Sequence, residues 1–106
     1  MAAEQIQEII QYELRIHQVK IQVNETKTQL TVVINRSLDT RVDYSALTEA
    51  ILTKLNAWEL EVPKYKILGR VEKHTKPEWQ QVFDNPHSRK GSRFLGLFNS
   101  KSKKTN

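Results

Sequence analysis

The sequence predicts a single small α+β domain of the order αββαβ, with a three-stranded sheet, two helices on one face of the sheet, a short closing helical turn and a disordered C-terminal tail. Apolar residues recur at helical spacing in two segments and at alternate positions in three others. A length of 106 residues with 38% apolar content suits one hydrophobic core and is too short for two.

Charge divides the chain into two parts. The first 86 residues hold 11 of the 17 Lys and Arg residues and all 12 Asp and Glu residues, whereas residues 87–106 hold six Lys and Arg and no acid. The net charge of +5 therefore comes from a nearly neutral body and a basic tail. We expect a domain over residues 1–86 and a flexible tail over residues 87–106.

The first helix is predicted over residues 3–15. Its apolar residues form one stripe at helical spacing: Ile6, Ile9, Ile10 and Leu14. From Gln18 the period changes to two, which predicts a β-hairpin with a polar link over residues 25–27. Its two strands carry the alternating apolar residues Val19, Ile21 and Val23, then Leu30, Val32 and Ile34.

Asp43 is well placed to cap a second helix, although Thr40 offers a competing start. The apolar positions of this helix are Leu47, Ile51, Leu55 and Trp58. Pro63 cannot continue the helix, and a third strand follows with Tyr65, Ile67, Gly69 and Val71 at alternate positions. Residues 75–83 are predicted to form the closing helical turn, because Pro77 suits an early helical position and Trp79 and Phe83 are four residues apart.

Several short motifs follow one another in this order. Leu47, Ile51 and Leu55 precede Lys66-Ile67-Leu68-Gly69-Arg70, which precedes Lys76-Pro77-Glu78-Trp79 and Phe83. In this spacing residues 6–83 resemble a small domain that occurs singly or in tandem in many uncharacterised cyanobacterial proteins. The resemblance implies a hairpin, a helix, a strand before Gly-Arg and a closing Pro-x-Trp, with an adaptor-like role and no reaction. Asp43 stands where that domain often has a proline.

No catalytic, cofactor or metal site is predicted. The three histidines, His17, His74 and His87, lie in separate contexts without a second ligand at metal-binding spacing. No hydroxyl residue lies in a G-x-S-x-G motif. The absence of cysteine and of an apolar leader after Met1 fits a cytoplasmic protein, and no run approaches the roughly 20 apolar residues of a membrane span.

Gly69 and Arg70 each have two interpretations. Gly69 falls on the inward side of the third strand, where Trp79 or Trp58 could lie against the backbone. Arg70 then points to the other face, where it is solvated, pairs with an acid such as Glu72, or anchors an acidic partner or a phosphate.

Helices on one side of the sheet leave the other face open. By alternation this face carries Lys20, Gln22, Thr31, Val33, Lys66, Leu68 and Arg70. Apolar anchors inside a basic rim suit a protein partner or a homodimer, so Val33, Lys66, Leu68 and Arg70 are candidate partner-binding residues. An ordinary solvated sheet face is the alternative.

The tail supplies a second set of candidates. Its partner-binding residues are predicted to be Arg89, Lys90, Arg93, Phe94, Leu97 and Phe98. Cations beside aromatic anchors suit an acidic protein groove or an anionic membrane surface. Nucleic acid would respond to the same charges, and a solvated, disordered terminus is the alternative.

The function that we favour from the sequence is a noncatalytic protein-interaction or regulatory module, cytoplasmic or peripheral at a membrane, whose tail contacts an acidic partner. The second hypothesis is an RNA-binding protein of K-homology-like topology. The K-homology fold clamps RNA with a G-x-x-G loop, and residues 1–68 contain no glycine.

Overall fold

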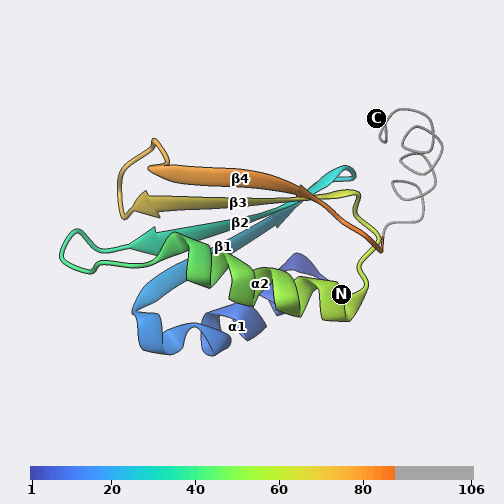
Figure 1. Cartoon of the computed structure of the whole chain (residues 1–106), viewed down its shortest axis with the longest axis horizontal. Helices are drawn as coiled ribbons and strands as arrows, with labels where there is room; N and C mark the ends of the chain where they lie inside the picture. Colours follow the sequence, from blue (N-terminus) through green and yellow to red (C-terminus); the bar gives the residue numbers. More distant parts are fainter. Residues whose placement is uncertain (88–106) are drawn as a thin grey trace, which may run out of the picture.

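The computed structural model describes residues 1–87 as two α-helices and one four-stranded sheet. The elements in chain order are α1 (Ala3–Glu13), a 3-10 turn η1 (Arg15–His17), β1 (Val19–Glu25), β2 (Gln29–Arg36), α2 (Tyr44–Trp58), β3 (Lys64–Val71) and β4 (Trp79–Asp84). Figure 1 shows both helices on the same side of the sheet. The predicted α+β class is confirmed, but the sheet has one strand more than predicted.

The strands lie in the sheet in the order of the sequence, β1-β2-β3-β4. The outer pairs are antiparallel and the central pair, β2 with β3, is parallel. Parallel neighbours need a long crossover connection, and α2 provides it by running along one side of the sheet from the end of β2 to the start of β3.

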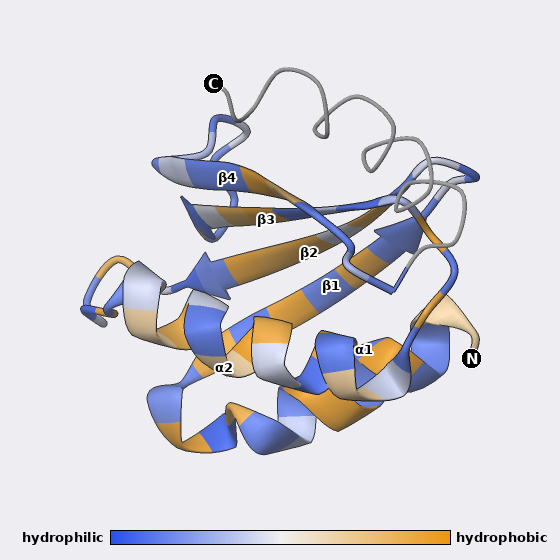
Figure 2. Cartoon of the chain, turned by 45° about the vertical axis from the view of Figure 1, so that its right-hand side comes forward, coloured by the Kyte–Doolittle hydropathy of each residue, from blue (hydrophilic) through white to orange (hydrophobic). Residues whose placement is uncertain are grey.

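The hydrophobic core lies between the helices and the sheet. Figure 2 shows the alternation of hydrophobic and hydrophilic residues along β1 that places one set of side chains in this layer. The buried apolar side chains are Ile6, Ile10, Leu14, Val19, Ile21, Val23, Leu30, Val32, Ile34, Leu47, Ile51, Leu55, Val62, Tyr65 and Ile67. This set contains most of the periodic positions that defined the predicted elements.

The ends of the helices follow from local chemistry. The Asp43 carboxylate accepts a hydrogen bond from the Ala46 backbone N–H at 3.2 Å, which confirms Asp43 rather than Thr40 as the start of α2. Glu59, with a positive φ of 51°, ends α2. The first helix is shorter than predicted, because the chain tightens into η1 and turns at Gln18, which has a φ of 59°.

The prediction of a helical turn over residues 75–83 is wrong, because Trp79–Asp84 form strand β4. This strand pairs with β3 from Gly69 opposite Trp79 to Lys64 opposite Asp84. Residues four apart share a face in a strand as well as in a helix, so the spacing of Trp79 and Phe83 fits both structures. Both aromatic side chains still pack at the edge of the core, as the sequence predicts.

Candidate binding site on the open sheet face

Side chains of all four strands form rows across the sheet face that the helices leave uncovered. The register places Val33 beside Gln22 on one side and Leu68 on the other, with Gln80 next to Leu68. A second row contains Asn24, Thr31, Lys66 and Val82, and a third contains Lys20, Asn35 and Arg70. We call this surface, formed by the side chains of these three rows, the open face.

Arg70 is held in place on the open face by two neutral amides. Its Nε donates to the Asn35 side-chain oxygen at 2.7 Å, and a terminal nitrogen donates to the Gln22 side-chain oxygen at 3.0 Å. The Asn35 amide nitrogen in turn donates to the Lys20 carbonyl and to the Gln22 side chain, both at 3.1 Å. Because both acceptors on the guanidinium are neutral, the network fixes its position without neutralising its charge.

The other cations of the open face differ in their pairing. Lys64, at the rim, forms an ion pair with Asp84 at 2.8 Å. Lys20, Lys66 and Arg70 form no salt bridge with any acid in the part of the chain that the structure describes. The open face therefore carries three uncompensated positive charges.

Apolar side chains lie between these charges. Val33 is only 6% exposed, because its neighbours in the row cover it, and Leu68 beside it is half-buried. Val82, at the β4 edge, is 51% exposed. The open face thus has a buried apolar centre, an exposed apolar residue at the β4 edge and positive charges around them.

The structure brings together the four candidate residues of the predicted sheet face. Val33, Lys66, Leu68 and Arg70 share the open face, and Val33 lies directly beside Leu68. The six tail candidates, Arg89, Lys90, Arg93, Phe94, Leu97 and Phe98, lie outside the described residues.

Arg70 is neither simply solvated nor paired with Glu72; among the described residues it bonds to Asn35 and Gln22 instead. Sequence reasoning missed Asn35, although the alternation that selects Thr31 and Val33 also places Asn35 on the same face.

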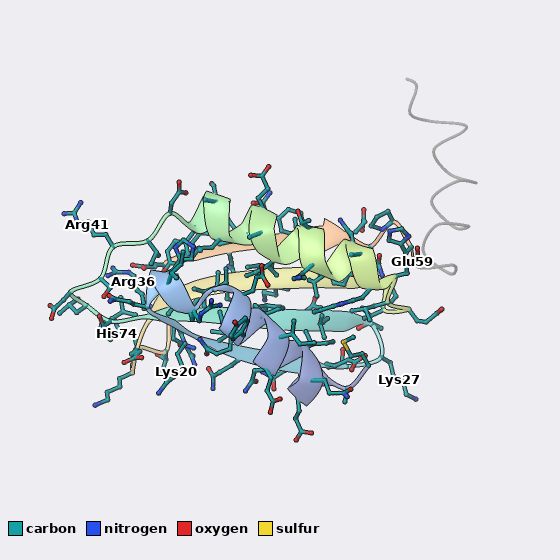
Figure 3. All side chains as sticks on the ribbon, turned by 90° about the horizontal axis from the view of Figure 1, so that it is seen from below. Lys20, Lys27, Arg36, Arg41, Glu59 and His74 are labelled. Carbon is teal, nitrogen blue, oxygen red and sulfur yellow. The ribbon has the colours of Figure 1, made fainter. Side chains whose placement is uncertain are left out.

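A second polar cluster lies at the end of the sheet where Arg36, Arg41 and His74 are labelled in Figure 3. The Arg36 guanidinium binds both carboxylate oxygens of Glu78, at 2.6 and 3.1 Å. Its remaining terminal nitrogen lies within hydrogen-bond distance of three backbone carbonyls, those of Ser37, Leu38 and Thr40. Arg36 therefore ties the loop after β2 to the β3–β4 hairpin.

Tyr44 completes this cluster. Its hydroxyl donates to Glu78, and its ring stacks on Trp79 with 5.7 Å between the ring centroids. The Arg36 and Tyr44 hydrogen bonds lower the pKa of Glu78 to about 2. Burial, together with the hydrogen bond to Glu78, raises the pKa of Tyr44 to about 12.

Gly69 is the residue that makes room for Tyr44. A Cβ atom at Gly69 would lie 2.2 Å from Cε1 and 2.5 Å from Cζ of the Tyr44 ring. The sequence predicts Trp79 or Trp58 against Gly69, whereas the ring that occupies this space is that of Tyr44. Tyr44 lies three residues before Leu47 and so extends the helical spacing of α2, a signal that sequence reasoning did not use.

The cluster borders a surface pocket of about 510 Å³ lined by Arg36, Leu38, Arg41, Val42, Tyr44, Glu78 and Trp79. Shifted pKa values often mark functional sites, but structural ion pairs produce them as well. Here all three guanidinium nitrogens of Arg36 form internal hydrogen bonds. One carboxylate oxygen of Glu78 accepts from both Arg36 and Tyr44. We interpret the cluster as a structural clamp that positions α2 against the β3–β4 hairpin.

Within residues 1–87 no three His, Cys, Asp or Glu side chains are grouped closely enough to hold a metal ion. Neither of the two helices in this range has the length and apolar content needed to cross a membrane.

Comparison with known proteins matched the chain to no family model, no curated protein and no solved structure.

Proposed function

We propose that the protein is a noncatalytic interaction module that binds an acidic surface of a protein partner through the open face. The observation that carries this proposal is the charge of Arg70, which Asn35 and Gln22 hold in position and which no described acid neutralises. A cation that is already ordered loses less side-chain entropy when it binds a carboxylate. The basic segment at residues 89–104 supplies a second contact with the same acidic partner or with an anionic membrane.

The distribution of aromatic residues favours protein over RNA as the partner. Sheet surfaces that bind single-stranded RNA stack bases on exposed aromatic side chains. No residue of the three open-face rows is aromatic. Tyr65, Trp79 and Phe83 instead occupy alternate positions that face the helices, and they contact the core. The only glycine among residues 1–87 is Gly69, which Tyr44 covers, so this range has no G-x-x-G clamp.

The first test maps the contact on the full-length chain. Isotope-labelled protein is titrated with a polyglutamate peptide while backbone amide signals are followed by NMR. We expect the largest shifts within the described region at Lys66, Leu68 and Arg70. If only signals of residues 88–106 move, the open face is not the contact and the proposal is wrong.

Two matched charge reversals then measure how much the open face contributes. Lys66→Glu places a carboxylate on the open face, on the far side of Leu68 from Arg70 along β3, whereas Lys27→Glu makes the same change at the β1–β2 hairpin tip, at the opposite end of the molecule from Arg41 (Figure 3). We expect Lys66→Glu to weaken polyglutamate binding by about tenfold and Lys27→Glu by less than about twofold. Equal losses would indicate nonspecific attraction by net charge.

A single-stranded RNA oligonucleotide and phosphatidylserine vesicles serve as competing probes. If the RNA bound more tightly than polyglutamate and lost affinity in Lys66→Glu, the second hypothesis, an RNA-binding protein, would replace the proposal. Vesicle binding that survives Lys66→Glu but requires Phe94 and Phe98 would assign the membrane contact to the tail alone.

A further inference from the structure

The two edge strands of the sheet, β1 and β4, differ in whether side chains cover their outward backbone groups. At the β1 edge, the Gln11 side chain donates to the Val19 carbonyl at 2.8 Å and accepts from the Ile21 N–H at 2.8 Å. The Gln7 side chain accepts from the Val23 N–H at 2.9 Å. Two glutamines of α1 thus occupy the backbone groups that an added strand would need, which blocks edge pairing at β1.

The β4 edge has no such cover in the described part of the chain. The Asn85 N–H donates to the Pro63 carbonyl at 2.8 Å, so Asn85 and Pro63 form a hydrogen-bonded pair at the end of the β3–β4 pairing. Since bonded and non-bonded residues alternate in an antiparallel pair, Phe83 and Gln81 bond to β3. The backbone N–H and C=O groups of Gln80, Val82 and Asp84 therefore point outward from the sheet.

The composition of β4 lacks the usual protection of a free edge. Exposed edges normally carry Lys, Pro or an inward-pointing charge. Trp79-Gln80-Gln81-Val82-Phe83 contains no charged residue and no proline, and Val82 at its centre is 51% exposed. Asp84, the one charge of the strand, is already paired with Lys64.

We propose that β4 pairs antiparallel with β4 of a second copy of this chain, around a twofold axis at Val82. In this register Val82 faces Val82 of the second copy, and Gln80 faces Asp84 of the second copy. Every outward-pointing backbone group named above then has an outward-pointing partner. The two Asp84 residues lie on opposite sides of the axis, so no like charges face each other. A twofold interface must be self-complementary in this way.

A groove beneath the edge supports a second copy as the occupant. It has a volume of about 330 Å³ and is lined by Ser45, Thr48, Glu49, Leu52, Trp79, Gln81 and Phe83, between α2 and β4. The buried Thr48 hydroxyl in its wall has no hydrogen-bond partner among the described residues. Pairing two β4 strands would bring both grooves, with the half-buried rings of Trp79 and Phe83, to the interface.

The proposed dimer goes beyond the proposed function, because it uses the β4 edge and not the charges of the open face. It joins the two open faces into one eight-stranded surface. Dimerisation is measured as the mass of the chain and acidic-partner binding as the affinity for polyglutamate, so the failure of one proposal does not imply the failure of the other.

The test is the mass of the full-length chain in solution, measured by sedimentation and by light scattering up to about 1 mM. Wild-type protein should reach twice the 12.4 kDa chain mass. Val82→Pro removes only an outward N–H, which an edge strand tolerates, and should give a folded monomer by circular dichroism. Asn24→Pro cannot serve as the control for Val82→Pro, because the Asn24 backbone bonds inward to β2. The control is instead Asn24→Lys, at the β1 end of the same row, which is matched to the variant Val82→Lys.

Charge complementation separates an interface defect from a folding defect. Val82→Lys and Val82→Glu each place like charges at the twofold axis, and each variant alone should be monomeric while Asn24→Lys remains dimeric. Mixing the two Val82 variants places opposite charges at the axis, and native mass spectrometry should then detect the mixed dimer. A monomeric wild-type chain, a dimer that survives Val82→Lys, or a mixture that stays monomeric would each overturn the proposal.

Discussion

Gly69→Ala is predicted to disrupt the clamp through a single added methyl group. The new Cβ would lie 2.2–2.6 Å from three atoms of the Tyr44 ring, so the ring must move. The movement would break its stacking on Trp79 and its hydrogen bond to Glu78. The Gly69 backbone itself is not strained, because no described glycine has a positive φ.

The magnitude follows from these contacts. Aromatic stacking contributes about 0.5–1.5 kcal/mol and a hydrogen bond to a charged group about 1.5–3 kcal/mol. Against this loss, replacing a glycine by alanine stabilises by about 0.4–1 kcal/mol, because the unfolded chain has fewer conformations. We therefore expect Gly69→Ala to lower the free energy of unfolding by about 1–4 kcal/mol, a fall in Tm of roughly 4–30 °C for a domain of this size.

A double-mutant cycle with Tyr44→Ala tests the cause. Without the ring, the alanine at position 69 has room, so Gly69→Ala should stabilise the Tyr44→Ala background by about 0.4–1 kcal/mol. The sign of the effect thus reverses between the two backgrounds. Urea unfolding followed by circular dichroism measures all four free energies. An equal loss in both backgrounds would refute the assignment of Tyr44 as the residue that requires Gly69.

Four further predictions concern buried or perturbed polar groups. The lowered pKa of Glu78 should stabilise the fold by about 1–2 kcal/mol above pH ~4.5, after allowance for its partial exposure. This contribution should fade as the pH falls towards 2. Urea unfolding at several pH values should show that Glu78→Gln removes this part of the acid dependence. Tyr65→Phe should raise the free energy of unfolding by about 1 kcal/mol, because the buried Tyr65 hydroxyl has no described hydrogen-bond partner, and a loss would show that it has one. Asn85→Ala should cost about 2–4 kcal/mol by unpairing two backbone carbonyls at 2.6 and 2.7 Å, and a cost below 1 kcal/mol would contradict that role. Gln11→Ala should expose the β1 edge and increase aggregation on light scattering, an effect that the matched change Gln5→Ala should lack.

The elements that could be predicted are those whose apolar period is unambiguous. Val19, Ile21 and Val23 are buried on one face of β1, and Leu47, Ile51 and Leu55 are buried on one face of α2. Burial of one face is what enforces each period, so the sequence carries it directly. The open face followed from the same alternation, because the residues between the buried ones must point to the other side of the sheet.

The fourth strand was not predictable from spacing alone. Trp79, Gln81 and Phe83 share one face of a strand, while Trp79 and Phe83 also fit one helical turn. The decision depends on pairing with β3, which is a tertiary contact. Its composition gives a weak local signal, since Trp, Val and Phe favour strands.

The clamp and the blocked edge depend on contacts between distant parts of the chain. Arg36 and Glu78 are 42 positions apart, and Gln7 and Val23 are 16 apart. A glutamine on a helix and an arginine at a strand end have many possible partners, so residue type alone does not select one. Only the packing of α1 along β1 and the return of the chain through β4 bring these groups within hydrogen-bond distance.

The cover of the β1 edge and the charge of the open face both restrict how copies of the sheet can associate. A sheet with one uncovered face and two free edges invites disordered aggregation unless pairing is restricted. Gln7 and Gln11 close the β1 edge, and the uncompensated charges of Lys20, Lys66 and Arg70 oppose stacking of one open face on another copy of itself. Self-association is thereby directed to the β4 edge, whose one charge, Asp84, is paired with Lys64, while the open face stays available to a partner of opposite sign. Lys20, Lys66 and Arg70 thus oppose stacking of like faces and also form the surface proposed for the acidic partner.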